Sequence, residues 1–140
     1  MIVYADTSAL AKLFLEEDGS EEMRTISRDA EVTSSVSVAY VELRAALAAA
    51  IRSGRVSSLL LDSLTIELER VWSDLGVIAV DEVLLRRAGD LAEQMRLRAY
   101  DAVHLTALQE SGDPGEIAFV CWDSELRAAA ESLGYQLLPR

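Results

Sequence analysis

The chain begins with Met1-Ile2-Val3-Tyr4-Ala5-Asp6, a short apolar run that ends on a carboxylate. The same pattern returns near the other end, in Ile117-Ala118-Phe119-Val120-Cys121-Trp122-Asp123. Short apolar runs of this kind are typical of buried β-strands. Asp6 and Asp123 are therefore expected at the carboxyl ends of two strands, which is the edge where open α/β sheets bind their ligands.

The segments between these runs alternate between strand-like and helix-like patterns. The apolar spacing predicts helices over residues 8–17, 20–28, 36–52, 56–72, 81–95, 101–109 and 125–132. Strands are predicted over residues 2–5, 32–34, 77–80, 117–121 and 135–138. Strands separated by helices imply right-handed crossovers and a mainly parallel sheet covered on both faces. The predicted fold class is α/β, a three-layer α/β/α sandwich in which helices 36–52 and 56–72 form an antiparallel hairpin.

The composition indicates one domain over residues 1–140. The chain has 140 residues, 51% of them hydrophobic, which suffices for a substantial core, and no proline-rich or glycine-rich linker divides it. The single cysteine, Cys121, excludes an intramolecular disulfide and a zinc–thiolate cage. Neither a signal peptide nor a membrane-spanning segment is predicted, so a soluble, cytoplasmic protein is expected.

The formal net charge of −11 argues against simple electrostatic binding of nucleic acid, because lysine and arginine supply most phosphate contacts. An RNA or DNA substrate would therefore need a metal ion to help bind it. The same charge also suits a basic protein partner. An acidic surface that only maintains solubility is the favoured interpretation of the overall charge.

Asp6 and Asp123 have two interpretations. Each precedes a predicted helix, and aspartate is among the best N-caps, so for either residue taken singly the cap is favoured. The shared sheet edge changes this balance, because neighbouring carboxylates repel unless a cation lies between them. Together they indicate a metal site, with Thr7 and Ser8 as supporting hydrogen-bond donors.

Glu42 lies on a predicted helix among apolar residues three and four positions away: Val38, Ala39, Ala45 and Ala46. A charged carboxylate on an apolar face must be paired or must coordinate a metal. A salt bridge to a buried arginine is the alternative. Metal binding is favoured, since Arg44 points to a different side of the helix.

Asp101 is predicted to face inward, because the residues on its helical face are mostly apolar: Leu97, His104, Leu105 and Leu108. A helix cap is the alternative role. His104 is the only histidine and could be a base or a ligand. A single histidine in an apolar stripe is more often a hydrogen-bonded core residue, so His104 is left out of the predicted catalytic set.

The four acidic residues, Asp6, Glu42, Asp101 and Asp123, offer only oxygen ligands. Hard cations such as Mg²⁺ or Mn²⁺ prefer such ligands, whereas zinc and copper favour nitrogen or sulfur. One such ion, or two, can activate water and stabilise the leaving oxygen in phosphoryl chemistry. The pattern therefore predicts metal-dependent phosphoryl chemistry.

Four segments together resemble the PIN-domain ribonucleases, and most closely the VapC toxins: Val3–Leu10, Val41–Leu43, Tyr100–Leu105 and Trp122–Leu126. The likeness spans essentially the whole chain. It implies a parallel sheet of about five strands, an Mg²⁺- or Mn²⁺-dependent endoribonuclease acting on RNA, and pairing with a cognate antitoxin. A homodimer is expected from the apolar content and the helical flank, and no membrane association is expected.

The resemblance also assigns residues. By motif match, Asp6, Glu42, Asp101 and Asp123 take the family's acidic positions, with Asp6 and Asp101 as direct ligands and Ser8 as a supporting hydrogen bonder. One departure is visible. The family often has threonine two residues before its last aspartate, where this chain has Cys121. A hydroxyl contact there is lost or is made weakly by sulfur, which leaves Asp123 the least secure member.

Two other classes of protein compete with this interpretation. Phosphoaspartyl receivers and haloacid-dehalogenase-like enzymes fit poorly, because Lys12 is the only lysine and Ser8 stands where the latter need a second aspartate. A non-catalytic acidic module that docks a basic partner explains the charge well. It leaves Glu42 unexplained.

Overall fold

The computed structural model describes residues 1–140 and contains one five-stranded sheet in the order β3-β2-β1-β4-β5. All four pairings are parallel, which confirms the predicted class. The strands are β1 (Ile2–Ala5), β2 (Val32–Val36), β3 (Gly76–Ile78), β4 (Ile117–Val120) and β5 (Gln136–Leu138). Because every strand runs the same way, all carboxyl ends lie at one edge.

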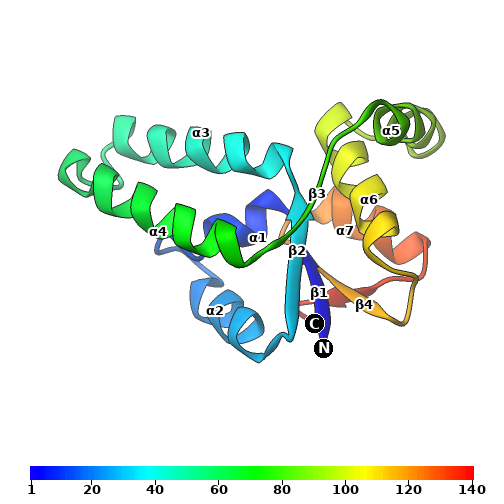
Figure 1. Cartoon of the computed structure of the whole chain (residues 1–140), viewed down its shortest axis with the longest axis horizontal. Helices are drawn as coiled ribbons and strands as arrows, with labels where there is room; N and C mark the ends of the chain where they lie inside the picture. Colours follow the sequence, from blue (N-terminus) through cyan, green and yellow to red (C-terminus); the bar gives the residue numbers. More distant parts are fainter.

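Helices cover both faces of the sheet. One face carries α1 (Thr7–Ala11), α2 (Ser20–Asp29), α3 (Val38–Arg52) and α4 (Leu61–Asp74), and the other carries α5 (Glu82–Met95), α6 (Ala99–Ser111) and α7 (Ser124–Ser132) (Figure 1). The chain changes face after β3, because right-handed crossovers moving in the opposite direction across the sheet must run over its other side. The arrangement is the predicted three-layer sandwich.

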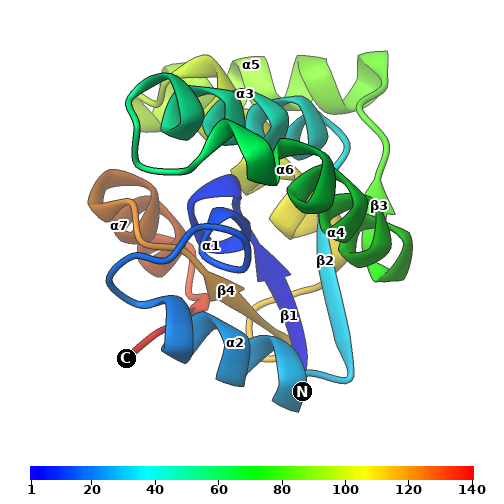
Figure 2. The same cartoon turned by 90° about the vertical axis from the view of Figure 1, so that its left-hand side faces the viewer.

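The change of direction brings β1 and β4 together at the middle of the sheet, with Ala5 paired to Val120 (Figure 2). Connections leave these two strands on opposite faces, which makes a crevice beyond their carboxyl ends the expected ligand site. The backbone N–H of Asp6 donates to the carbonyl of Val120 at 3.1 Å. Asp6 and the residues after β4 are therefore neighbours.

The core explains why these strands are so apolar. Tyr4, Phe119 and Val120 are fully buried because helices lie over both faces of the sheet. Central strands of parallel sheets accordingly show continuous apolar runs in place of alternation. Thirty buried hydrophobic residues form one cluster that joins the sheet to both helical layers.

Most predicted boundaries agree to within two residues, as for the start of α6 below, and two helices differ by more. The helix predicted over 8–17 ends at Ala11, because side chains hold the following backbone in turns: Lys12 donates to the carbonyl of Asp18 and Ser20 to that of Leu15. The helix predicted over 56–72 begins as a short 3-10 turn, Ser58–Leu60, before α4. Helix α6 starts at Ala99, ahead of the predicted position.

Helices α3 and α4 form the predicted hairpin, which extends away from the sheet (Figure 1). Gly54 closes it with a φ of 76°, a left-handed conformation that glycine adopts without strain. Beyond the turn, Leu59 is 91% exposed. No helix in the chain combines the length and the apolar character needed to cross a membrane.

Candidate active site

Asp6 lies at the carboxyl end of β1 and is 4% exposed. Its Oδ1 caps α1 by accepting from the backbone N–H of Ala9 at 2.9 Å, so the expected capping role is present. The Ser8 hydroxyl lies 2.8 and 2.9 Å from the two carboxylate oxygens, as predicted for a supporting donor. Burial raises the pKa of Asp6, and the charge of His104 and these hydrogen bonds oppose that effect.

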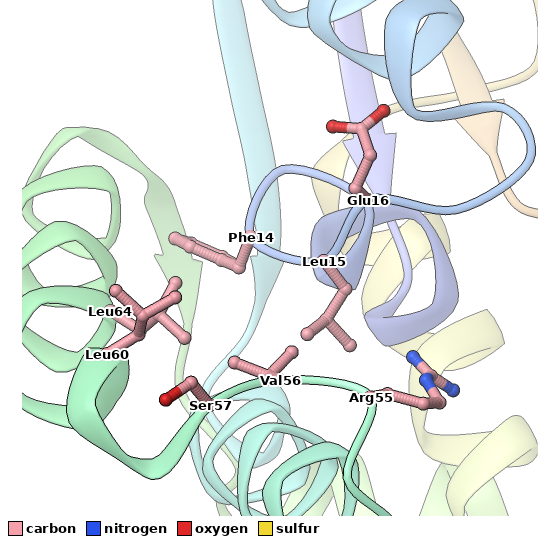
Figure 3. A pocket seen from close by; sticks show the side chains of 8 residues that line it. All are labelled: Phe14, Leu15, Glu16, Arg55, Val56, Ser57, Leu60 and Leu64. Carbon is pink, nitrogen blue, oxygen red and sulfur yellow. The ribbon is translucent and has the colours of Figure 1, made fainter.

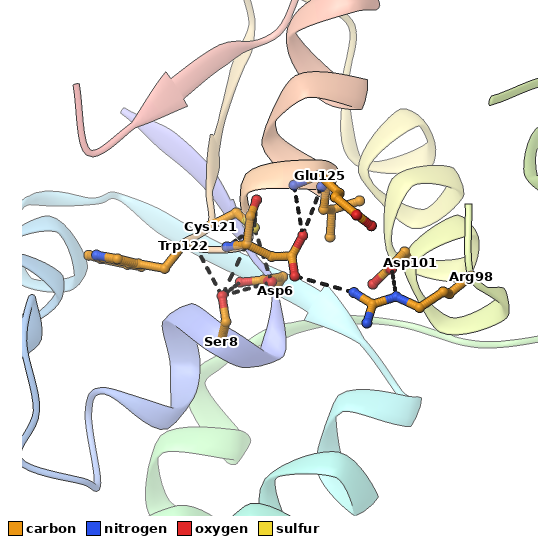
Figure 4. A network of polar contacts seen from close by, with 9 residues as sticks. Asp6, Ser8, Arg98, Asp101, Cys121, Trp122 and Glu125 are labelled. Carbon is orange, nitrogen blue, oxygen red and sulfur yellow. Dashed lines mark hydrogen bonds and ion pairs between the residues drawn. The ribbon is translucent and has the colours of Figure 1, made fainter. Parts of the chain in front are cut away.

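Cys121 makes a polar contact at the position where the family often has threonine. Its Sγ lies 3.1 Å from Oδ2 of Asp6, and the backbone N–H of Asp123 points to the same sulfur at 3.3 Å (Figure 4). Burial and the neighbouring Asp6 carboxylate raise the pKa of the thiol far above its ordinary value, so the thiol is protonated and can donate. The sulfur thus links the Asp6 carboxylate to the backbone of Asp123.

Asp123 is the N-cap of α7. Its Oδ1 accepts from the backbone N–H groups of Glu125 at 3.0 Å and Leu126 at 2.9 Å. Its Oδ2 lies 3.3 Å from Nη2 of Arg98. One oxygen therefore serves the helix, and the other faces a cation.

Arg98 joins two of the predicted site residues (Figure 4). Its Nε donates to Oδ2 of Asp101 at 2.8 Å while Nη2 contacts Asp123, so one guanidinium connects α6 to α7. The hydrogen bond to Asp101, with the charges of both aspartates, raises the pKa of Arg98. Asp101 is in the first turn of α6, whose N-cap is Arg98, so the alternative role of Asp101 as a cap is not observed.

Glu42 belongs to a hydrogen-bonded group that the sequence did not predict. Nε2 of His104 lies 2.8 Å from Oε1 of Glu42, and the Thr7 hydroxyl donates to the same oxygen at 2.8 Å. On the other side of the ring, Nδ1 of His104 lies 3.0 Å from the hydroxyl of Tyr4. With a proton on Nε2 the ring donates to Glu42, and Nδ1 either accepts from the Tyr4 hydroxyl or, when the ring is charged, donates to it.

The surroundings shift the pKa values of two of these residues, Glu42 and Tyr4. Burial raises the pKa of Glu42, but the hydrogen bond and charge of His104 and the Thr7 hydroxyl outweigh burial and leave it lowered. Tyr4 is fully buried beside Asp6, and both conditions raise its pKa well above the usual value. Glu42 is therefore charged and Tyr4 neutral, with the ring of His104 between them.

Two details of the Glu42 prediction need correction. Glu42 lies at the border of the buried face of α3 and not within an apolar face, since neighbouring Ala45 is exposed. Its partner is His104, which the sequence pattern did not suggest for Glu42. Arg44 donates to the Tyr40 hydroxyl and stays away from Glu42, as expected.

The four acidic residues thus form two pairs. Thr7, next to Asp6 in the chain, donates to Glu42, and Arg98 bridges Asp101 and Asp123. Glu42 and Asp101 line one cavity from opposite helices. As the side chains stand, no three histidine, cysteine or acidic residues are grouped closely enough to hold a metal ion.

The donor set fits a hard divalent cation in chemistry, because it consists of carboxylate oxygens with hydroxyl groups beside them. A guanidinium already lies between Asp101 and Asp123, which shows that this position attracts positive charge. A metal ion using those oxygens must replace Arg98. The arrangement is compatible with Mg²⁺ or Mn²⁺ once that side chain moves.

Sequence reasoning missed Arg98 and set aside His104. The signal for Arg98 was its spacing three residues before Asp101, which lets the side chain of an N-cap meet one in the first turn of the helix. The signal for His104 was its burial in an apolar stripe, where both ring nitrogens need partners; the residue is 3% exposed. Its partners come from β1, α1 and α3, which no local pattern reveals.

Known proteins resemble the chain over nearly its full length. A profile of the PIN domain family matches residues 3–132. Two ribonucleases of Mycobacterium tuberculosis, VapC45 of strain CDC 1551 and VapC49 of strain H37Rv, are each 34% identical over 138 residues, which is 99% of this chain and 95% of theirs. Ribonuclease VapC46 of strain H37Rv is 30% identical over 137 residues, 97% of this chain and 95% of its own.

Two solved structures share the fold. PAE2754 from Pyrobaculum aerophilum matches with a TM-score of 0.71 and 22% identity, covering 98% of this chain and 84% of that one. A toxin–antitoxin complex from Klebsiella pneumoniae matches with a TM-score of 0.60 and 14% identity, covering 87% of both chains. At these identities the likeness shows the fold alone.

Proposed function

The chain belongs to the PIN-domain family, among its VapC ribonucleases, and from this premise we propose that it is a toxin endoribonuclease that hydrolyses RNA phosphodiester bonds. The observation that supports the proposal is a chain of contacts between the elements that carry the four carboxylates. Thr7, next to Asp6, donates to Glu42, Glu42 and Asp101 line one cavity, and Arg98 joins Asp101 to Asp123. These residues would hold Mg²⁺ or Mn²⁺, with Asp6 and Asp101 as the direct ligands.

A bound divalent ion would supply an activated water molecule and stabilise the leaving oxygen of the phosphodiester. The chain's own residues fix the carboxylates. Ser8 and Cys121 orient Asp6 through both of its oxygens, and Thr7 orients Glu42. His104 holds Glu42 from the buried side and keeps it ionised.

The test is to heat the protein with Mg²⁺, Mn²⁺ or Zn²⁺ and to assay RNA cleavage with each metal. Binding to the folded state raises the melting temperature by mass action, so Mg²⁺ and Mn²⁺ should raise it and support cleavage that a chelator abolishes. Zn²⁺ should show no comparable specific effect. No stabilisation at millimolar Mg²⁺ or Mn²⁺ would instead favour the acidic docking module.

The proposed protein partner is a cognate antitoxin, and the chain offers an apolar groove for it (Figure 3). Phe14 and Leu15 form one wall, and Val56, Leu60 and Leu64 form the other. The groove lies on the flank formed by the helices around residues 8–28 and 36–72, which we propose the antitoxin wraps. A basic residue from the antitoxin would reach towards Asp6, Glu42 and Asp101, and a bidentate arginine would suit these carboxylates.

Co-expression tests this docking site. Leu60→Asp puts a charge into the groove and should abolish neutralisation by the antitoxin while RNA cleavage persists. Ile66→Asp is the matched control, because Ile66 is an exposed residue of the same hairpin that does not line the groove. Equal loss of neutralisation in both variants would place the partner elsewhere. The homodimer stays a prediction from the sequence.

A further inference from the structure

Arg98 is the only lysine or arginine that forms an ion pair with any of the four proposed metal ligands. Its side chain is 69% exposed, although it contacts two carboxylates. Exposed pairs contribute little to stability, because water and salt screen them and the side chain loses freedom. The fold therefore does not need Arg98 to stay between Asp101 and Asp123.

Metal binding and this ion pair compete for the same atoms. Arg98 occupies Oδ2 of Asp101 and Oδ2 of Asp123, and a divalent ion beside them would repel the guanidinium. The released side chain would remain next to the metal, because Arg98 is the N-cap of α6 and lies only three residues before Asp101. A guanidinium in that position can bind a phosphate through two parallel hydrogen bonds.

An exposed aromatic residue lies beside this cation. Tyr100 is 58% exposed and lines the same cavity as Glu42, Arg98 and Asp101. Aromatic side chains hold unpaired RNA bases by stacking, and this contact tolerates any base. The cavity thus combines carboxylates that could bind a metal ion, the guanidinium of Arg98 that could bind a phosphate, and the ring of Tyr100 that could stack on a base.

We infer that Arg98 and Tyr100 form a nucleotide-binding subsite of the proposed ribonuclease, in which Arg98 leaves Asp101 and Asp123 when the metal binds and takes a substrate phosphate. Tyr100 stacks on the adjoining base. This inference rests on the proposed metal site. It explains how a chain with a net charge of −11 can still contact the RNA backbone next to the scissile bond.

The first measurement is Mn²⁺ affinity by calorimetry without RNA. Arg98→Gln removes the competing cation, so Mn²⁺ should bind about two- to fivefold more tightly than to wild type. The matched control is Arg86→Gln, which loses the same charge from an exposed arginine paired with Glu82 on α5. The control should leave the affinity near the wild-type value.

The second measurement is binding of a short, fluorescently labelled, unstructured oligoribonucleotide in Ca²⁺. This ion takes carboxylate oxygens but polarises water less than Mg²⁺. Arg98→Gln should weaken RNA binding about tenfold, since it removes a charge-assisted phosphate contact. Tyr100→Leu should weaken it roughly fivefold or more without changing Mn²⁺ affinity, and Tyr100→Phe should lose much less.

Arg98→Gln should therefore tighten Mn²⁺ binding and weaken RNA binding. A purely structural role of Arg98 would instead weaken the binding of both ligands or of neither. The inference is overturned if Arg98→Gln and Tyr100→Leu bind RNA as tightly as Arg86→Gln, or if Arg98→Gln leaves Mn²⁺ affinity unchanged. Wild-type protein that binds no Mn²⁺ at all would overturn the proposed function itself.

Discussion

The two halves of the acidic site are held by different kinds of partner. Asp6 and Glu42 accept hydrogen bonds from hydroxyl, thiol and imidazole groups that are largely buried. Asp101 and Asp123 share one exposed arginine. The first half is fixed by the fold before any ligand arrives, whereas the second half is held by a side chain that can leave.

The energies of the two halves differ accordingly. Leaving a buried polar group without its partner costs about 1–3 kcal/mol, whereas an exposed ion pair contributes little to stability. Changes near Asp6 and Glu42 should therefore disturb the geometry of the site. Changes at Arg98 should alter the exchange of ligands and leave the fold intact.

The largest expected effect is on the rate of RNA cleavage, which should fall more for a change in the first half of the site than for one in the second. Asp6→Asn should slow RNA cleavage at least about a hundredfold, because it removes a proposed direct ligand that Ser8 and Cys121 hold in place. Asp123→Asn should cost only about tenfold, because Asp123 is not one of the two proposed direct ligands. Single-turnover assays in Mn²⁺ give both rates. Equal losses would show that the two halves do not differ in this way.

A smaller effect is expected at His104, which holds Glu42 without being a proposed ligand. His104→Leu leaves Glu42 and Tyr4 without their partner and should reduce cleavage about tenfold. His104→Gln offers an amide N–H for Glu42 and should recover part of the rate. If glutamine and leucine variants have the same Mn²⁺ affinity and the same rate, His104 serves packing alone.

The smallest effect is on stability without metal. Burial raises the pKa of Asp6, so between its ordinary and its folded pKa the native state binds more protons than the unfolded state. The contribution of Asp6 to stability is then fully present below the ordinary pKa and is lost as pH rises through the folded pKa. The loss is about 1.4 kcal/mol for each pH unit that separates the two pKa values.

Asp6→Asn removes this titration. In chelator, the variant should equal or exceed wild type in unfolding free energy at neutral pH, with the advantage shrinking as the pH falls towards about 4. Urea unfolding at several pH values measures the difference. A variant that is less stable at neutral pH would mean that the carboxylate is needed to cap α1.

The sequence was sufficient to predict the two site residues that follow strands. Asp6 and Asp123 follow apolar runs, and the rule that parallel strands share a carboxyl edge places them together without knowledge of the strand order. Resemblance then supplied the family and its acidic positions, and the fold and the family matches confirm the predicted class. The roles of the four residues remain a proposal.

Other features depend on contacts that no local pattern encodes. Arg98 meets Asp123 only because α7 begins beside the first turn of α6, and His104 meets Tyr4 across 100 positions of chain. Strand order likewise cannot be derived from periodicity. The early end of α1 has a similar cause, since Lys12 and Ser20 bind backbone carbonyls in the loop that follows.

The most direct test of the proposed metal site is a crystal structure of the protein soaked in Mn²⁺, with anomalous scattering used to locate the ion. The expected result is a peak bound by Asp6 and Asp101, close to Glu42 and Asp123, with Arg98 turned away from both aspartates. A fully soaked crystal with no peak among these carboxylates, and with Arg98 still bridging Asp101 and Asp123, would contradict it.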